Sequence, residues 1–499
     1  MARRSTLIRR VPGAYPLAAC CLALLAFAAC ATPPEPGPRK RTVLMDAGPE
    51  AAGESRRAPA LVTRTDDARV GREEARSVAE TIGILDAPAL NAYVDRIGQR
   101  LVKGLPHRSF GYEFRVVDQV EPNAFALPGG YVFISRGLLA LARNEDELAN
   151  VLGHEITHAA QRHAAARQAM IEQKGMLLIL PTQAASMAAY SRDMERSADE
   201  GGQILAAAAG YDPKGMASFM ASLYAQERLL LGTPRRATYF DTHPTSAERA
   251  SMNAIRAGEL RWVRDPALGD TVTRYLRAIE GIDIGPRPQE GVFVAQRFLH
   301  PDLDFQIRFP DGWRTLNERS AVGAQAPRGR AVVFLSAEKQ KLDPKAAAEV
   351  FVTENRPRGL RVTESKPVRL SQGDAWRLEL EVPQQGGSII GLVTFLTHKS
   401  ATWRFTGATL AFDRSRYEDV FLLTFRSFRP LTPEQRASIR GTRLELVEAR
   451  PGETPADICK RADNVWSPSE TALANGVSPA DAFRGGELVK IARSYAYAP

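Results

Sequence analysis

The strongest constraint on the fold is the sequence HEITH at residues 154–158, which lies inside a helical pattern. Asn144 can cap such a helix, and Glu147 lies three residues later, as in a capping box. At about 100° per residue, two histidines four positions apart share one edge of the helix, and Glu155 lies between them and the apolar stripe. The pattern predicts two imidazoles on one metal ion, with a carboxylate beside the metal-bound water.

Catalytic zinc needs a third protein ligand besides His154 and His158, together with an open fourth position. A third histidine in the pattern HExxHxxGxxH is excluded, because Gln161 and Ala164 occupy the required glycine and histidine positions. His163 lies nine residues after His154, so we expect it on the opposite side of the helix, in solvent. The third ligand must therefore come from another segment.

Glu195 is the better candidate for the third ligand. It lies in a second long helical stretch that Gly210 stops. Asp199 follows four residues later on the same face, where it can accept a hydrogen bond from a ligand imidazole and set its tautomer. The alternative is an ordinary surface glutamate beside Arg192 and Arg196.

The N-terminus resembles a bacterial export signal. Basic residues at positions 3–10 precede an apolar run over 17–29, which is shorter than the ~20 residues of a membrane-spanning helix. Small residues directly before Cys30 predict a lipoprotein signal peptide over 1–30, with lipid on Cys30. The alternatives are lipidation at Cys20 and simple cleavage to a soluble periplasmic protein.

Residues 31–60 are rich in Pro, Gly, Arg and Glu and show no apolar period, so they predict a flexible linker. Together with a lipid on Cys30, this linker predicts a protein tethered to a membrane in the periplasm. Ala31 directly after the lipidated cysteine favours the outer membrane, by resemblance to sorting patterns.

The composition of the 499 residues, 44% of them hydrophobic, allows two or three domains with separate cores. The net charge is +9, from 66 Lys and Arg against 57 Asp and Glu, and four of the arginines belong to the extreme N-terminus. No stripe of basic residues with interleaved aromatics follows downstream. We therefore expect no nucleic-acid partner.

The hydrophobic period predicts an α+β chain of three parts. Residues 61–285 are mainly helical with one short hairpin, and they carry the metal motif. Over 290–432 the period changes to the alternation of half-buried strands, clearest at 376–382, which predicts an α+β domain of unknown role. A third unit covers 440–499.

Four ordered motifs resemble the gluzincin peptidases of the HtpX, Oma and BepA type, especially the periplasmic BepA branch. The resemblance covers roughly residues 71–260. The motifs are Asn123–Gly130 followed by Tyr131–Ser135, the HEITH sequence, Glu195–Asp199, and Thr242–Pro244 with Glu248–Arg249.

This resemblance implies a mainly helical gluzincin-type metallopeptidase domain with one Zn²⁺ per chain. His154, His158 and Glu195 would be the metal ligands and Asp199 would support one of them. Zinc lowers the pKa of its bound water to about 7, and Glu155 would act as the general base.

The resemblance also implies further site residues. His243 would approach the metal and keep the enzyme latent, and Arg249 would help to bind the carbonyl oxyanion. The alternative is that both only fix the local loop and helix.

Substrate binding is implied at the hairpin, where the strand Tyr131–Ser135 would be an edge strand that pairs with an extended polypeptide. Asn123, Tyr131, Val132 and Phe133 are the expected substrate-binding residues.

The closing segment resembles a LysM module, a small βααβ unit that commonly binds peptidoglycan. The resemblance rests on Arg450–Thr454, Leu473–Val477 and Gly485–Ile491. A module kept only for packing or protein contact is the alternative. Cys459 lies at a core position of the module, so we expect an inert thiol there.

The sequence therefore predicts an envelope zinc endopeptidase acting on misfolded or misassembled exported proteins. The alternative is a cell-wall-tethered chaperone or scaffold that uses the peptidase fold mainly for binding. The intact Glu155 favours the enzyme, since a pure binder does not need this residue.

Overall fold

The structure is a computed structural model that describes residues 64–108, 110–166, 191–229, 239, 243, 247–356, 359–384 and 387–497. The predicted signal peptide, Cys30 and linker lie outside these ranges. The chain folds into two compact units. Of the described residues, we call Val294–Phe298 with Gln306–Pro430 the middle unit, and those in 64–293, 299–305 and 431–497 the main unit.

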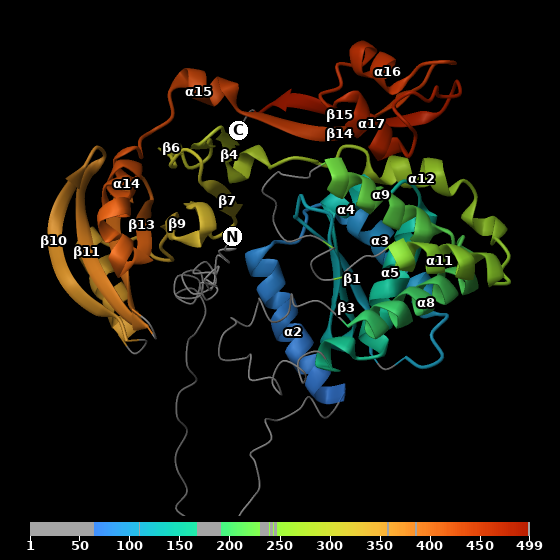
Figure 1. The fold of residues 1–499 in the computed structure, drawn as a ribbon, viewed down its shortest axis with the longest axis horizontal. Helices are drawn as coiled ribbons and strands as arrows, with labels where there is room; N and C mark the ends of the chain where they lie inside the picture. Colours follow the sequence, from blue (N-terminus) through green and yellow to red (C-terminus); the bar gives the residue numbers. More distant parts are fainter. Residues whose placement is uncertain are drawn as a thin grey trace, which may run out of the picture. The chain divides into compact units, whose positions relative to one another are not determined.

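The main unit is built of helices around a small sheet (Figure 1). Its N-terminal helices are α2 (Arg64–Thr81), α3 (Pro88–Val102), α4 (Arg136–Leu141) and α5 (Glu145–Ala160). The later ones are α8 (Arg192–Ala208), α9 (Gly215–Leu229), α11 (Ala247–Glu259) and α12 (Thr271–Ile279).

Helix α5 is the core helix of the main unit and is buried almost all round, not only along one apolar stripe. Its polar first turn is buried because each side chain has a partner from another part of the unit. Glu145 accepts from the Tyr93 hydroxyl at 2.7 Å and pairs with Arg274, and Asp146 accepts from Arg264 at 3.0 Å. These contacts offset the cost of removing carboxylates from water.

The small sheet has the strand order β1-β3-β2, with β1 at Glu113–Val117, β2 at Ala124–Leu127 and β3 at Tyr131–Ser135. Strand β3 is parallel to β1 and antiparallel to β2. The expectation that Tyr131–Ser135 is an edge strand is therefore wrong. The turn before β3 places Gly129 and Gly130 at φ values of 79° and 91°, and the chain then returns between the two other strands.

The middle unit contains a seven-stranded antiparallel sheet in the order β10-β11-β12-β13-β9-β8-β7. Phe351 of α13 (Pro344–Asn355) packs with Leu378 and Phe395 on one face, and Phe425 of α14 (Arg414–Arg426) packs on Phe405 of the other face. The strands are β7 (Arg314–Glu318), β8 (Ala321–Gln325), β9 (Ala331–Ala337), β10 (Arg361–Leu370), β11 (Gly373–Gln384), β12 (Gly387–His398) and β13 (Ala401–Leu410).

The strands β4 (Val292–Val294), β5 (Arg297–His300) and β6 (Phe305–Arg308) form a separate three-stranded sheet. The short helix α15 (Pro433–Ser438) begins with Thr432 as its cap, in a capping box with Gln435. The C-terminal module follows and has the element order βααβ: β14 (Arg440–Glu448), α16 (Pro455–Arg461), α17 (Pro468–Asn475) and β15 (Leu488–Ala496).

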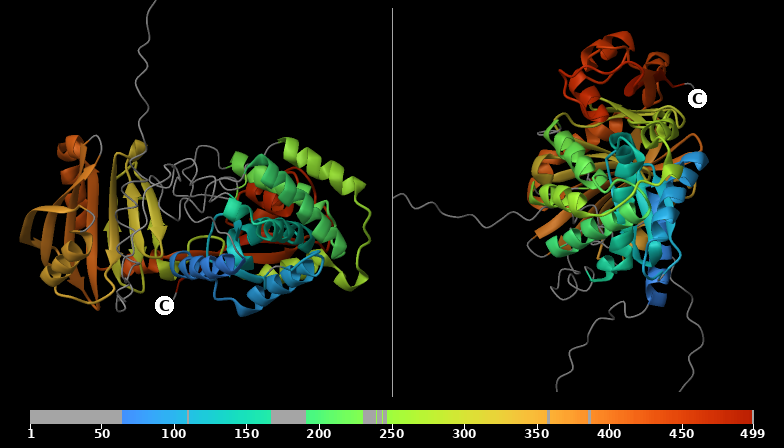
Figure 2. Two further views of the ribbon diagram at one scale, coloured as in Figure 1. Left: turned by 90° about the horizontal axis from the view of Figure 1, so that it is seen from below. Right: turned by 90° about the vertical axis from the view of Figure 1, so that its right-hand side faces the viewer.

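The C-terminal module belongs to the main unit and packs beside α9 and α12 (Figures 1 and 2). The backbone of Gly281 and Ile282 pairs with Leu444 of β14, beside the two-stranded sheet formed by β14 and β15. The ammonium of Lys490 is buried and donates to the carbonyls of Ala140 and Ala142 at 2.8 and 2.9 Å. The module is therefore joined to the helical body by polar as well as apolar contacts.

Among the described helices, none has both the length and the apolar character that crossing a bilayer requires.

Candidate metal centre

Helix α5 presents the two histidines of the HEITH sequence. Its N-terminus is set by the Asn144 side chain, which accepts from the backbone N–H of Glu147 at 2.9 Å. The Glu147 carboxylate accepts from the backbone N–H of Arg143 at 2.9 Å, one residue before the cap. The capping residues thus determine where the helix begins, and the histidines follow two to four turns later.

Helix α8 presents Glu195 and runs antiparallel to α5, because Ser197 donates to Gln161 while Gly202 lies against Gly153. Ser191 caps α8, and its hydroxyl accepts from Met194 N–H at 3.3 Å. The two helices approach closely where glycines face each other. This close approach brings the first turn of α8 to the last turns of α5.

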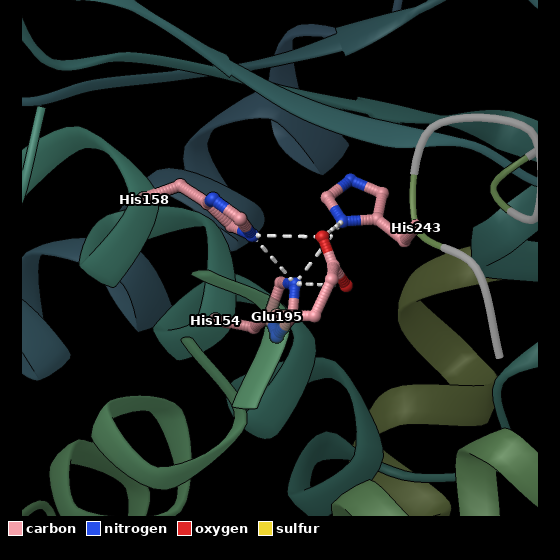
Figure 3. Close-up of side chains that lie close together, drawn as sticks. All are labelled: His154, His158, Glu195 and His243. Atoms are coloured by element: carbon pink, nitrogen blue, oxygen red, sulfur yellow. Dashed lines mark hydrogen bonds and ion pairs between the residues drawn. The ribbon is translucent and has the colours of Figure 1, made fainter. Parts of the chain in front are cut away.

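Four side chains converge at this crossing: His154, His158, Glu195 and His243, all buried (Figure 3). The Nε2 atoms of His154 and His158 lie 3.0 Å apart, and His154 Nε2 lies 3.2 Å from His243 Nδ1. Glu195 Oε1 lies 3.5 Å from His158 Nε2, and its Oε2 lies 3.7 Å from His154 Nε2. One ligand atom from each side chain lies within 4.8 Å of all the others, which is a group able to bind one metal ion.

Asp199 sets the tautomer of His154. Its Oδ1 lies 3.0 Å from His154 Nδ1, so the proton of the ring belongs on Nδ1 and the lone pair of Nε2 faces the centre of the group. Burial by itself raises the pKa of Asp199, but hydrogen bonds with His154 and Arg249 hold that pKa well below its ordinary value. The carboxylate therefore stays ionised and acts as an acceptor.

His163 lies inside the site, and the expectation that it is solvated is wrong. Helix α5 ends at Ala160, and Arg162 adopts a positive φ of 55°, which turns the chain back toward the helix. His163 is 7% exposed, and its Nδ1 lies 3.0 Å from His158 Nδ1. Burial lowers the pKa of His163, so the neutral ring can accept the Nδ1 proton of His158.

His243 lies next to both glutamates of the site. Its Nδ1 lies 3.0 Å from Glu195 Oε1, and its Nε2 lies 3.5 Å from Glu155 Oε1. The ring stacks on Tyr239, with centroids 4.3 Å apart, and the backbone N–H of Tyr239 donates to Pro122 O at 3.0 Å. The position of His243 is therefore linked through Tyr239 to Pro122, which precedes β2.

Arg249 holds the two carboxylates of α8. Its Nε and Nη2 donate to Asp199 at 2.9 and 2.8 Å, and its Nη1 lies 2.9 Å from Glu195 Oε2. All three nitrogens thus face carboxylates. This arrangement does not fit the expected role in oxyanion binding, because the guanidinium is already engaged by the residues that surround the metal position.

The substrate-binding residues expected from the hairpin are mostly inaccessible. The side chains of Val132 and Phe133 are 1% and 2% exposed, and the backbone of β3 pairs on both sides. Tyr131 packs against the α2 side of the sheet, and Asn123 is buried. The backbone of β3, at which a substrate strand was expected to pair, is already paired with β1 and β2.

The donor set fits a zinc ion. Imidazole nitrogens and a carboxylate oxygen, as in this group, are ligand atoms that zinc prefers in proteins. Asp199 and the neutral His163 accept the outward Nδ1 protons of His154 and His158, which is the support that zinc-binding imidazoles commonly have. Glu155, fully buried on the same helix, lies beside this group.

Comparison with known proteins agrees with this geometry. Residues 88–256 match the model of peptidase family M48. The chain is 28% identical over 219 residues to the beta-barrel assembly-enhancing protease of Escherichia coli, covering 39% of this chain and 44% of that protein. It is 29% identical over 212 residues to the protein of the same name from Yersinia pestis, covering 37% and 43%.

A eukaryotic relative is the mitochondrial metalloendopeptidase OMA1 of Schizosaccharomyces pombe, 31% identical over 172 residues and covering 32% of this chain and 50% of that protein. The chain thus spans half or less of the length of these three relatives.

Proposed function

From the match of residues 88–256 to the model of peptidase family M48 and from the geometry of the site, we propose that the chain is a zinc-dependent endopeptidase of the bacterial cell envelope. Its substrates would be misfolded or misassembled exported proteins. One observation carries the proposal: His154, His158 and Glu195, from two helices, lie within one ligand shell, and the Glu155 carboxylate lies beside it. The names of the relatives from Escherichia coli and Yersinia pestis, which refer to beta-barrel assembly, support a location in the cell envelope.

Each residue of the site has a separate role in the proposed hydrolysis. Zinc, when bound, supplies a Lewis acid and lowers the pKa of water. Glu155 takes the proton from the attacking water and passes it to the departing amine. Asp199 and His163 orient the two imidazoles, and Arg249 positions Glu195 and Asp199.

His243 would be a fourth protein donor to the ion, and a zinc ion bound by all four side chains would leave no position for water. We therefore assign to this arrangement a closed, latent form. Hydrolysis would require His243 to move away from this position.

An extended substrate would pair with β2 rather than β3, because β2 is an edge strand of the sheet and packs against α5. Its outer edge has no strand partner within the described residues. An extended polypeptide added there would lie along the helix that carries the metal ligands, and main-chain hydrogen bonds would hold it without demanding one sequence.

Attachment completes the proposal: a lipid on Cys30 would hold the chain at the outer membrane, and residues 440–499 would contact peptidoglycan. Metabolic labelling with palmitate in wild type and C30S tests the anchor. Retention of the full chain on purified murein sacculi tests the wall contact.

The deciding experiment compares the wild type with Glu155→Gln. We expect equal zinc content by mass spectrometry and a loss of casein hydrolysis of about 100-fold or more, the usual contribution of a general base. Glu200→Gln, an exposed glutamate on α8, is the matched control and should leave both measurements unchanged. Unchanged turnover in Glu155→Gln, or a wild type without stoichiometric zinc, refutes the proposal.

A further inference from the structure

A cavity of about 500 Å³ is lined by residues of α9 and α17. Both helices belong to the main unit and are in contact. None of the four candidate metal ligands lines this cavity. The lining residues are Arg143, Ala221, Ser222, Ala225, Arg228, Leu229, Ser469, Ala472, Leu473, Gly476, Val477 and Pro479.

The walls are apolar on both sides. On α9, residues 221, 225, 228 and 229 share one helix face, and Leu229 is 47% exposed there. On the opposite side, Leu473, Val477 and Pro479 face the same space. A cavity of this size is within the range of sites that bind a small ligand or the end of a peptide.

The charge of the lining is positive, since it contains two arginines and no carboxylate. Arg143 is fixed in place by Glu147, which accepts from its Nε at 2.9 Å and its Nη2 at 2.6 Å, and by Ser218 O, which lies 3.3 Å from Nη2. Its Nη1 lies against Gly476, where there is no room for a Cβ. Arg228 is exposed and forms no ion pair with a carboxylate in the described part of the chain.

Glu147 compensates one of the two guanidiniums, so the cavity retains about one positive charge. That excess matches a single carboxylate, which arginine binds well through paired N–H donors. The apolar walls match a side chain next to that carboxylate. The uncharged polar side chains of the lining are Ser222 and Ser469, too few for a neutral sugar chain that must hydrogen-bond along its length.

We propose that this cavity binds the C-terminal end of a polypeptide, with an apolar last side chain between α9 and α17 and the terminal carboxylate at Arg143 and Arg228. Carboxylate capture of this kind is a recognised mode of peptide binding. The inference rests on the proposed function in one respect, because it takes polypeptides to be the ligands of this chain. It adds a second binding site, distinct from the one that hydrolyses.

The test uses the full chain with Glu155→Gln, so that the probe is not cleaved. A fluorescein-labelled heptapeptide ending in Ala-Leu with a free carboxylate is titrated by anisotropy, and the same peptide with a C-terminal amide is the control probe. We expect the amide to bind at least about tenfold more weakly, which corresponds to about 1.4 kcal/mol.

Two variants in the cavity and one control elsewhere locate the site. Arg228→Gln should weaken binding of the free-carboxylate peptide about tenfold, and Ala225→Trp should abolish it by filling the cavity without changing its charge. Arg72→Gln, an exposed arginine on α2, removes the same charge elsewhere and should have no effect. Circular dichroism of each variant checks that the fold is retained.

Equal binding of the acid and the amide overturns the inference, as does normal binding by Ala225→Trp. Competition by chitotetraose or octanoate as effective as that by the unlabelled peptide also overturns it, because the site would then be a glycan or lipid site. Cleavage of an internally quenched peptide by the chain with an intact Glu155 is measured separately. Lost cleavage with normal probe binding counts against the proposed function and not against this cavity.

Discussion

At the scale of single residues, the placement of His163 depends on one backbone angle. The positive φ of Arg162 changes the direction of the chain after α5. His163, which helical spacing places in solvent, therefore lies at the metal centre. There its Nδ1 lies 3.0 Å from His158 Nδ1. Asp199 Oδ1 lies at the same distance from His154 Nδ1. The two histidines thus have different supporting acceptors, one neutral and one ionised.

His163→Ala should lower zinc affinity about 10- to 100-fold, because His158 loses the acceptor that orients its ring. His163→Gln should recover part of that affinity, since its side-chain oxygen can accept the same proton. Zinc affinity is measured by competition with a chelating dye. Equal affinity of His163→Ala and the wild type would show that His158 does not need this acceptor.

His243→Ala should raise the rate of peptide hydrolysis, because it removes the donor that closes the group of ligands. A tenfold increase would place the closed form about 1.4 kcal/mol below the open one. His107→Ala, an exposed histidine on the same unit, is the control. Lost hydrolysis with retained zinc would instead give His243 a direct part in the reaction.

At the scale of elements, the site exists because α5 and α8 cross closely. A Cβ on Gly202 would lie 2.7 Å from the backbone N of His154, and a Cβ on Gly153 would lie 2.8 Å from Gly202 O. Larger residues would push α8 away from α5. Glu195 would then move away from the two imidazoles.

Gly202→Ala should therefore lower both zinc content and stability, the latter by about 1–3 kcal/mol, as expected for an overpacked core. Gly258→Ala is the matched control: it is also a helix glycine, and a Cβ there meets nothing within 4 Å. That control should be neutral or stabilising by up to about 1 kcal/mol. Urea unfolding and metal analysis of both variants check the prediction, and similar behaviour of the two would contradict it.

At the scale of the whole molecule, Lys490 joins the C-terminal module to the helical body. Its ammonium donates to the carbonyls at the end of α4, in the field of Glu147 and Arg143. Burial lowers the pKa of Lys490 to about 7, from an ordinary value of 10.5. The attachment of the module is therefore sensitive to pH.

Between pH 7 and about 10, the unfolded chain binds a proton at Lys490 that the folded chain has released. The free energy of unfolding should therefore rise with pH in this window, by up to about 1.4 kcal/mol per pH unit from this group. Below about pH 7 both states are protonated and the contribution is constant. In Lys490→Met this part of the pH dependence should vanish. If the free energy of unfolding rises equally with pH in the wild type and in Lys490→Met, the prediction is contradicted.

The parts of the fold that depend on neighbours in the chain were predictable. Asn144 caps the start of α5, and Gly210, with a positive φ, follows the end of α8. Both signals depend only on residues three or four positions away in the chain. The alternation around Trp376–Val382 predicts β11 for the same reason. The spacing of His154 and His158 places them on one helix edge without reference to any other segment.

The sequence by itself determined the helices, the strands and the chemical character of the ligands, since these follow from local period and spacing. Only the tertiary structure decided that β3 is central, that Arg249 pairs with Glu195 and Asp199, and that the C-terminal module is part of the main unit. Strand order and side-chain partners depend on contacts between residues far apart in the chain. Patterns of neighbouring residues do not predict those contacts.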